Sequence, residues 1–208
     1  TEGLVGSEMC IRDRYSVLSE VGMLPAELMG LNEKNFKKFN YLIKNKRFLE
    51  NLIINVENII HYVKKNKKNS IILNYDESSE NFFKWYQQLT AESLGKKSKG
   101  ITPIISSMPK DNHSLLQLYL DGPKNCFFTF FNVTSKTSNK QSNKFILDDK
   151  KYLKNKNLSE ILEAQEKSTQ NIFRKKNIPF RSFNIKKKDE NTLGELFCFC
   201  VLETILLG

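Results

Sequence analysis

The sequence lacks the patterns that mark several classes of functional site. Its four cysteines, Cys10, Cys126, Cys198 and Cys200, show no C-x-x-C spacing, and neither histidine lies near them in a ligand pattern. This spacing supports neither a zinc site nor a disulfide framework, and it fits a reducing cytosol. Gly-rich phosphate loops, Ser-His-Asp constellations and H-E-x-x-H metal helices are also missing.

Long hydrophobic runs and a secretory leader are lacking too. The most apolar stretch, LFCFCVLETILLG, is interrupted by Glu203 and, even counted from Leu196, is too short to cross a bilayer. The N-terminus shows no basic start followed by an apolar core. These absences predict a cytoplasmic protein with no membrane partner.

Basic charge is abundant but dispersed. The 208 residues carry a net charge of +10, which suits anionic partners such as phosphorylated metabolites, nucleic acid or acidic membrane surfaces. The lysines are scattered through Lys/Asn/Ile-rich stretches such as KNKKNSII and KKYLKNKN, which is more typical of a solvated surface than of a binding stripe. We therefore expect no nucleic-acid partner. The 39% hydrophobic content is sufficient for one sizeable domain.

Short apolar runs alternate with helical patterns after residue 69. The runs IILNY, TPIIS and CFFTFFNV read as strands, and the first is apolar without interruption, which is the habit of parallel sheets. Helical patterns separate them, PFRSFNI reads as an edge strand, and TLGELFCFCVLETILL reads as a closing helix. The sequence therefore predicts an α/β fold, a three-layer sandwich whose mainly parallel sheet is flanked by helices.

The N-terminal third reads as helical. In YSVLSEVGMLPAELMGL we expect a short buried helix that breaks and restarts at Gly22 and Pro25. Apolar residues then keep a period near 3.6 over residues 36–63, which predicts one or two surface helices. Ser78 or Ser79 is expected to cap the helix that follows the first strand. The segment TSKTSNKQSNKF reads as a polar loop.

The helix containing WYQQLTAESLGK ends in an unusual way. Glu92 precedes Gly95, which suits a left-handed position after the last turn, so the carboxylate lies at the negative end of the helix dipole. This placement costs about 0.3 to 1 kcal/mol. Gln88 shares its face at an i, i+4 spacing, and the pair could hold a carboxylate over a substrate. The alternative is an ordinary solvated helix end.

Two further residues could take part in proton transfer or anion binding. His113 lies in KDNHSLLQLYLDGP near the start of an expected helix, where Asp111 could be the cap and the imidazole could shuttle a proton. Arg14 precedes YSVLSEVG at a possible helix start, a usual place for anion recognition. The alternative for His113 is an ordinary capped or surface histidine, and the alternative for Arg14 is an ordinary solvated arginine.

Four segments together resemble the glucose-6-phosphate isomerase family. They are RYSVLSEVG, QLTAESLGK, KDNHSLLQLYLDGP and TLGEL, at residues 14–22, 88–96, 110–123 and 192–196, and their order and spacing also match. The resemblance covers roughly the C-terminal half of that family's chain, its second sugar-isomerase (SIS) domain. It implies a flavodoxin-like α/β fold, a sugar-phosphate substrate, no metal or other cofactor, and a homodimer.

The resemblance also implies a role for each candidate residue. The general base that moves a proton between carbons 1 and 2 of the open-chain sugar falls on Glu92. The ring-opening histidine falls on His113, and in this family it is donated across the dimer interface. The arginine that stabilises the enediol-like intermediate falls on Arg14, and the substrate-side glutamine falls on Gln88.

The sequence departs from the family at both ends. We interpret residues 1–14 as non-native, because MCIRDR resembles a translated sequencing adapter and Arg12 and Asp13 stand where the family has Gly-Gly. Residues 15–208 then form an isomerase domain truncated at both ends, which we expect to be inactive alone. Two alternatives stay open: a non-catalytic regulatory module that only binds a sugar phosphate, and a basic nucleic-acid-binding protein.

Overall fold

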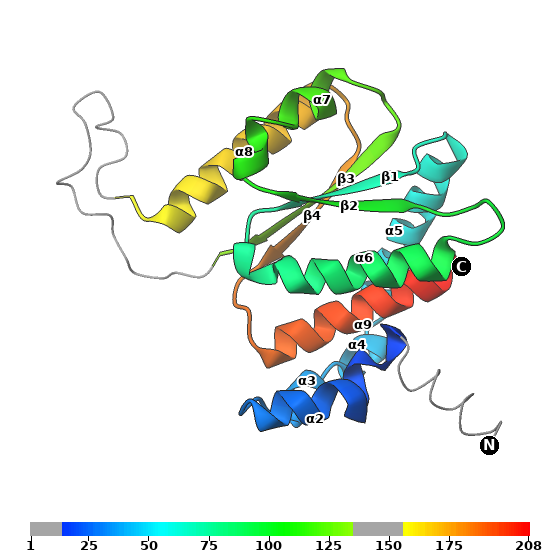
Figure 1. Ribbon diagram of the computed structural model, residues 1–208, viewed down its shortest axis with the longest axis vertical. Coiled ribbons are helices and arrows are strands. Elements are labelled where there is room, and N and C mark those ends of the chain that lie inside the picture. Colours follow the sequence, from blue (N-terminus) through cyan, green and yellow to red (C-terminus); the bar gives the residue numbers. More distant parts are fainter. Residues whose placement is uncertain (1–13, 135–155) are drawn as a thin grey trace. The chain divides into compact units, whose positions relative to one another are not determined.

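Four strands form one sheet in the order β2-β1-β3-β4. They are β1 (Asn69–Asn74), β2 (Thr102–Ser107), β3 (Cys126–Val133) and β4 (Phe180–Ile185). The central strand β3 pairs in parallel with β1, from Asn69 opposite Cys126, and with β4, from Phe128 opposite Phe180. This order is the beginning of the flavodoxin-like order 2-1-3-4-5. The predicted α/β class with a parallel sheet is confirmed, and so is the position of β4 at an edge (Figure 1).

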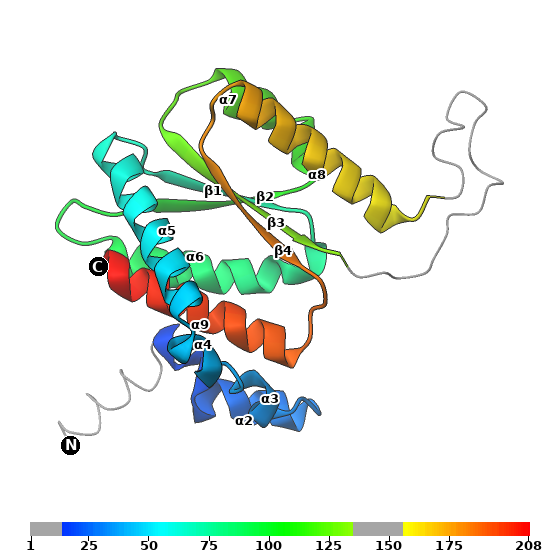
Figure 2. The ribbon, with the colours of Figure 1, turned by 180° about the vertical axis from the view of Figure 1, so that it is seen from behind.

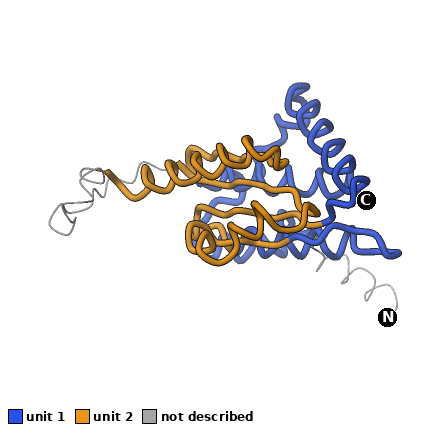
Figure 3. The backbone as a smooth tube through the Cα atoms, turned by 90° about the horizontal axis from the view of Figure 1, so that it is seen from above, with its two compact units in different colours: residues 1–68, 81–103, 188–208 blue, residues 69–80, 104–187 orange. Residues whose placement is uncertain are grey.

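The computed structural model describes residues 14–134 and 156–208, which divide into two compact units (Figure 3). Unit 1 contains residues up to 68, residues 81–103 and residues 188–208. Unit 2 contains residues 69–80 and 104–187, and therefore most of the sheet. The predicted polar loop TSKTSNKQSNKF falls almost wholly outside the described residues, as do residues 1–13 of the segment 1–14 that we interpret as non-native.

The core of unit 2 is aromatic and lies between the sheet and two helices, α7 (Leu116–Asp121) and α8 (Leu158–Lys175) (Figure 2). Phe173 of α8 is fully buried, and its ring meets those of Phe128 and Phe130 edge-on at centroid distances of 4.8 and 5.3 Å. Edge-to-face pairs of this kind stabilise a core by about 0.5 to 1.5 kcal/mol beyond their buried area. Strands β1 and β3 are buried on both faces, as their uninterrupted apolar sequences predict.

Unit 1 is helical. Its longest helices are α5 (Lys46–Lys64), α6 (Glu80–Leu94) and α9 (Glu190–Leu207), preceded by η1 (Arg14–Leu18), α2 (Glu20–Leu28), α3 (Glu33–Phe36) and α4 (Asn40–Lys44). Phe197 of α9 packs against Phe82 and Trp85 of α6 at centroid distances of 5.3 and 4.7 Å. The rings of Phe82 and Trp85 therefore pack α6 against α9. Among the described residues, no helix is long and apolar enough to span a membrane.

The first helical region breaks at a different place from the one predicted. Helix α2 runs through both Gly22 and Pro25, and the interruption falls at Ser19, between η1 and α2. Gly22 is needed for a close approach rather than for a break, because a Cβ atom there would lie 2.0 Å from the carbonyl oxygen of Val17. Residues 36–63 contain two helices, α4 and α5, as predicted, and the short α3 ends at Phe36.

The capping predictions were partly wrong. Ser78 and Ser79 lie in the 3-10 turn η2 (Glu77–Ser79), and their hydroxyls donate to the carboxylate of Asp76 at 2.7 and 2.5 Å. Asp111 does not cap α7, because the segment between them forms the separate turn η3 (Lys110–Asn112). Its carboxylate accepts from Ser106 Oγ and from the backbone N–H of Ser107. It thereby fixes the loop that follows β2.

Candidate active site

The exposed face of α6 carries the predicted glutamine and glutamate. Gln88 Nε2 donates to Glu92 Oε1 at 2.9 Å, and both side chains are exposed. Their neighbours Leu89 and Thr90 are buried. Gln87 Nε2 donates to the carbonyl oxygen of Pro103 at 2.8 Å, which ties the same turn to the start of β2. The i, i+4 pairing predicted from the sequence is therefore present on a helix that is fixed from its other side.

The end of α6 differs in one detail from the prediction. The helix ends at Leu94 and Gly95 follows it, as expected, and Gly95 N–H donates to the carbonyl oxygen of Ala91 at 2.9 Å. The left-handed residues come later, at Lys97 and Ser98, with φ of 52° and 60°. Gly95 is required for a different reason, because a Cβ atom would lie 2.4 Å from the Ala91 oxygen.

One hydrogen bond joins the segment of Arg14 to the helix of Glu92. The hydroxyl of Tyr15, next to Arg14 in η1, donates to Ser93 Oγ at 2.8 Å. Ser93 directly follows Glu92 in α6. Two motifs that are far apart in the sequence are therefore held together at the last turn of α6. The side chain of Arg14 itself lies outside the described residues.

The predicted histidine belongs to the other unit. His113 is exposed and follows the turn η3, three residues before α7 begins. It therefore lies in a connection between two helical turns rather than inside a helix. Glu92 and His113 belong to different compact units of the chain.

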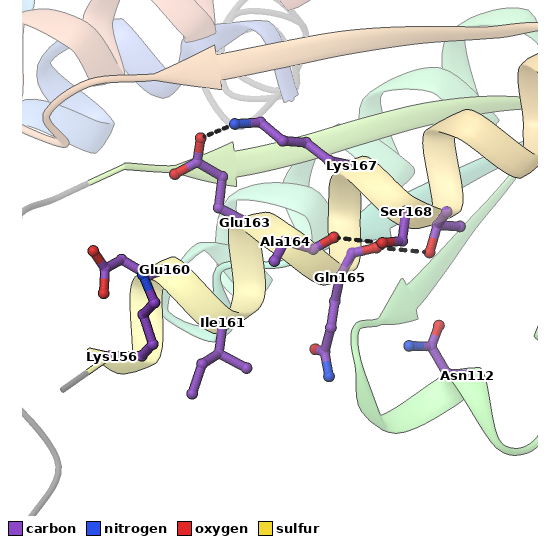
Figure 4. A pocket seen from close by; sticks show the side chains of 10 residues that line it. Asn112, Lys156, Glu160, Ile161, Glu163, Ala164, Gln165, Lys167 and Ser168 are labelled. Atoms are coloured by element: carbon purple, nitrogen blue, oxygen red, sulfur yellow. Dashed lines mark hydrogen bonds and ion pairs between the residues drawn. The ribbon is translucent and has the colours of Figure 1, made fainter. Parts of the chain in front are cut away.

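A cavity of about 780 Å³ lies beside this turn in unit 2. Asn112, the neighbour of His113, lines it on one side, and side chains of α8 such as Gln165 and Ser168 line it on the other (Figure 4). The Oδ1 atom of Asn112 is buried and accepts no hydrogen bond from the described residues. Buried acceptors are usually paired, so this oxygen is available to a donor in the cavity. Neither Gln88 nor Glu92 lines this cavity.

A buried polar cluster in unit 2 was missed by the sequence reasoning. Glu166 of α8 is only 2% exposed, and its carboxylate accepts from Asn132 Nδ2 at 2.7 Å and from Gln170 Nε2 at 2.8 Å. Asn132 lies near the carboxyl end of β3, the edge of a parallel sheet where ligands usually bind. The signal was present in the sequence, because Glu166 and Thr169 share the helical face of the buried Phe173.

The protonation of Glu166 should make the stability of unit 2 depend on pH. Burial raises the pKa of Glu166 above its ordinary value of 4.5, although the hydrogen bonds from Asn132 and Gln170 act in the opposite direction. The folded state thus keeps this proton to higher pH than the unfolded state does. The free energy of unfolding should therefore fall as the pH rises from about 4.5 through the folded pKa.

A Glu166→Gln variant should lose this dependence. Its free energy of unfolding relative to the parent should rise over that pH window and then level off, measured by native-state hydrogen exchange of the β3 amides. Glu163→Gln is the matched control, because Glu163 lies on the same helix but pairs with Lys167 at the surface. Parallel pH profiles for the parent and Glu166→Gln would contradict the prediction.

A second buried carboxylate lies in unit 1. Glu203 of α9 is fully buried; it accepts from the hydroxyl of Tyr86 on α6 at 2.6 Å and from the side-chain amide of Asn55 on α5. The sequence shows it as the one charge that interrupts the most apolar run. One side chain therefore connects the three long helices of unit 1.

The arrangement can support proton transfer but does not by itself show a complete site. The structure brings together Gln88, Glu92 and the η1 segment within unit 1, and it leaves His113 in unit 2. Within the described ranges, no three His, Cys, Asp or Glu side chains gather closely enough to hold a metal ion. An exposed carboxylate beside an amide donor suits a general base that acts on a polar substrate.

The curated relatives of the chain are named glucose-6-phosphate isomerases. It is 30% identical over 201 residues to the glucose-6-phosphate isomerase of Methanocaldococcus jannaschii, which covers 94% of this chain and 49% of that protein. It is 34% identical over 200 residues to the probable glucose-6-phosphate isomerase of Methanococcus maripaludis, over 94% of this chain and 45% of that protein. The chain is related to the glucose-6-phosphate isomerases. It spans about half the length of the curated relatives that it matches.

Solved structures agree with the fold. A hypothetical protein from Thermus thermophilus superposes on 94% of the chain and 49% of its own length, with a TM-score of 0.81 and 23% identity. A glucose-6-phosphate isomerase from Chlamydia trachomatis superposes on 68% of the chain and 30% of its own length, with a TM-score of 0.54 and 16% identity. At these identities both comparisons support the α/β fold alone. No protein-family model matches the chain.

Proposed function

We propose that this chain forms part of an aldose–ketose isomerase that interconverts glucose 6-phosphate and fructose 6-phosphate through an enediol intermediate. The observation that carries the proposal is the Gln88–Glu92 hydrogen bond on the exposed face of α6, in a segment that resembles the glucose-6-phosphate isomerases. A substrate for this reaction presents hydroxyl groups and an acidic C–H beside a carbonyl. An amide and a carboxylate held together suit both features.

Each residue takes one step of the reaction. Glu92 removes the proton from carbon 2 of the open-chain aldose and returns it to carbon 1, so the carboxylate is regenerated at the end of the cycle. Arg14 stabilises the negative charge that develops on the oxygen of the enediol-like intermediate. Gln88 orients the carboxylate and donates to a substrate hydroxyl. The Tyr15–Ser93 hydrogen bond supports this arrangement, because it keeps the Arg14 segment beside the last turn of α6.

His113 would open the sugar ring before proton transfer begins. We propose that it acts in the site of a second subunit of a cytoplasmic homodimer, as the family resemblance implies. Its exposure and its placement in unit 2, apart from the unit of Glu92, are compatible with donation to another copy of the chain. Donation of this kind would make each complete site depend on two subunits.

A chimera provides the test. Residues 15–208 of this chain would replace the matching half of the Methanocaldococcus jannaschii relative, and isomerisation would be followed in heavy water. An enediol mechanism incorporates solvent deuterium at the carbon that receives the proton. A chimera that binds glucose 6-phosphate but neither isomerises it nor exchanges its proton would instead support a regulatory binding module.

Subunit mixing makes the same test specific to the proposed residues. Glu92→Gln and His113→Gln chimeras should each be inactive, because each lacks one group at every site. Refolded together, half of the dimers are mixed, and one of their two sites is intact. We expect the mixture to recover about a quarter of the parent activity. Absence of recovery, with mixed dimers confirmed by mass spectrometry, would place both residues in the same subunit's site.

A further inference from the structure

A second cavity, of about 640 Å³, lies in unit 1. It opens where α5, α6 and α9 end, and Figure 1 and Figure 2 both show the ends of α6 and α9 side by side. Its apolar lining comes from these helix ends and from the residue before β2: Ile60, Val63, Leu94, Ile101 and Leu207. The volume lies within the range of small-molecule sites, about 300 to 1,000 Å³.

Lysines form the polar part of this lining. They are Lys64, Lys96, Lys97 and Lys99, all exposed. Within the described part of the chain, none of the four makes an ion pair or a side-chain hydrogen bond. No Asp or Glu occurs between Glu57 and Asp76 or between Glu92 and Asp111, so both segments that supply the lysines are free of acidic residues. The lysines therefore give the rim a positive charge that no acidic side chain of these two segments offsets.

Helix ends explain only part of this charge. Lys64 and Lys96 lie at the carboxyl-terminal ends of α5 and α6, where cations stabilise the helix dipole by about 0.3 to 1 kcal/mol. Lys97 and Lys99 lie beyond the last turn of α6, and the dipole effect falls off within that turn. Their position on the rim calls for another explanation.

The backbone of the loop between α6 and β2 is strained at Lys97 and Ser98, and the N–H groups of these two residues are available as hydrogen-bond donors. Lys97 and Ser98 are consecutive left-handed residues, a conformation that costs a non-glycine residue about 1 to 3 kcal/mol. Among the described residues, their N–H groups donate to no backbone carbonyl. Hydrogen bonds hold the loop on both sides, from Lys99 N–H to Lys96 oxygen and from Thr102 N–H to Lys68 oxygen. Strain of this kind concentrates at ligand sites.

We propose that this cavity binds a nucleoside polyphosphate. The phosphates lie on the lysine rim, where ammonium groups and free backbone N–H groups donate to their oxygens, and the base covers the apolar floor. Four ammonium groups match an anion that carries three to four negative charges. The apolar floor favours a phosphate chain joined to a ring over inorganic phosphate alone. The site goes beyond the proposed isomerisation, because its lysines and its apolar floor residues have no role in that reaction.

Calorimetric titration of the chain with ATP tests this site without any measurement of isomerisation. ATP should bind saturably with one site per chain. A Lys97→Gln/Lys99→Gln variant loses two charged contacts with the phosphates, so its affinity should fall by more than about tenfold. The matched control is Lys38→Gln/Lys44→Gln, two exposed lysines of the same unit that line neither cavity. This control should bind ATP within about twofold of the parent.

Two further titrations separate the phosphate chain from the ring. Tripolyphosphate should bind more weakly than ATP, and Ile60→Gln, at a floor position that is 36% exposed, should weaken ATP but not tripolyphosphate. Equal affinities for ATP and tripolyphosphate would overturn the nucleotide assignment. If Lys97→Gln/Lys99→Gln and Lys38→Gln/Lys44→Gln lose ATP affinity equally, the attraction is a diffuse effect of net charge and the site is overturned. ATP binding that does not saturate would overturn the site as well. Because every readout is binding, these outcomes are independent of whether the isomerase proposal holds.

Discussion

Glu92→Gln in the chimera is expected to lower kcat about 100- to 10,000-fold and to leave KM nearly unchanged, because general-base catalysis contributes a factor of this size. Glutamine keeps the length of the side chain and can still accept the hydrogen bond from Gln88. It cannot take a proton from carbon 2. Loss in kcat alone is the signature of an interaction made in the transition state. Coupled assays of fructose 6-phosphate formation measure both constants.

Glu80→Gln is the matched control for this substitution. Glu80 is also an exposed glutamate of α6, but it begins the helix whereas Glu92 lies in its last turn. Its replacement should change kcat by less than about twofold, since exposed charges far from the chemistry contribute little. If Glu80→Gln and Glu92→Gln lower kcat equally, Glu92 is not the base. Full deuterium exchange by the Glu92→Gln chimera would lead to the same conclusion.

Glu203→Leu is expected to lower the free energy of unfolding by about 2 to 6 kcal/mol. The substitution removes one acceptor from the buried hydroxyl of Tyr86 and one from the half-buried amide of Asn55, and each lost acceptor costs about 1 to 3 kcal/mol. The effect should appear in unit 1, which contains all three residues. Urea unfolding followed by the fluorescence of Trp85, which packs on α9 through Phe197, measures it.

A triple variant controls for the loss of the carboxylate itself. Replacing all partners of a buried polar group by apolar side chains of similar shape is nearly neutral. Glu203→Leu combined with Tyr86→Phe and Asn55→Leu should therefore recover most of the lost stability. Glu203→Gln, which can still accept from Tyr86, should lose less than Glu203→Leu. A triple variant no more stable than Glu203→Leu would show that the hydrogen bonds are not the source of the effect.

Local signals were sufficient for the regular elements of the sheet. Strand β3 has six consecutive buried residues and consists almost wholly of aromatic and β-branched side chains, so no other assignment fits its sequence. The same holds for β1: its uninterrupted apolar run predicted a strand of a parallel sheet, and the strand is buried on both faces. Periodicity alone also paired Gln88 with Glu92, because an i, i+4 spacing on one helix needs no tertiary information.

The local signals failed where long-range contacts compete with propensity. Pro25 and Gly22 predicted a break, yet α2 continues through both, and Gly22 instead allows the close approach of the Val17 carbonyl. Asp111 had the composition of a helix cap, but its carboxylate accepts from Ser106 and Ser107 at the end of β2. A cap and a loop bond use the same acceptor, and only the folded chain decides between them.

By itself, the sequence determined the alternation of strands and helices, the face of α6 that carries Gln88 and Glu92, and the resemblance to the glucose-6-phosphate isomerases. The tertiary structure decided which distant groups meet. It placed Tyr15 against Ser93, enclosed Glu166 and Glu203 within polar partners, and gathered four lysines from two segments around one cavity. Periodicity acts over a few residues, whereas these contacts join residues 32 to 148 positions apart, whose meeting depends on how whole elements pack.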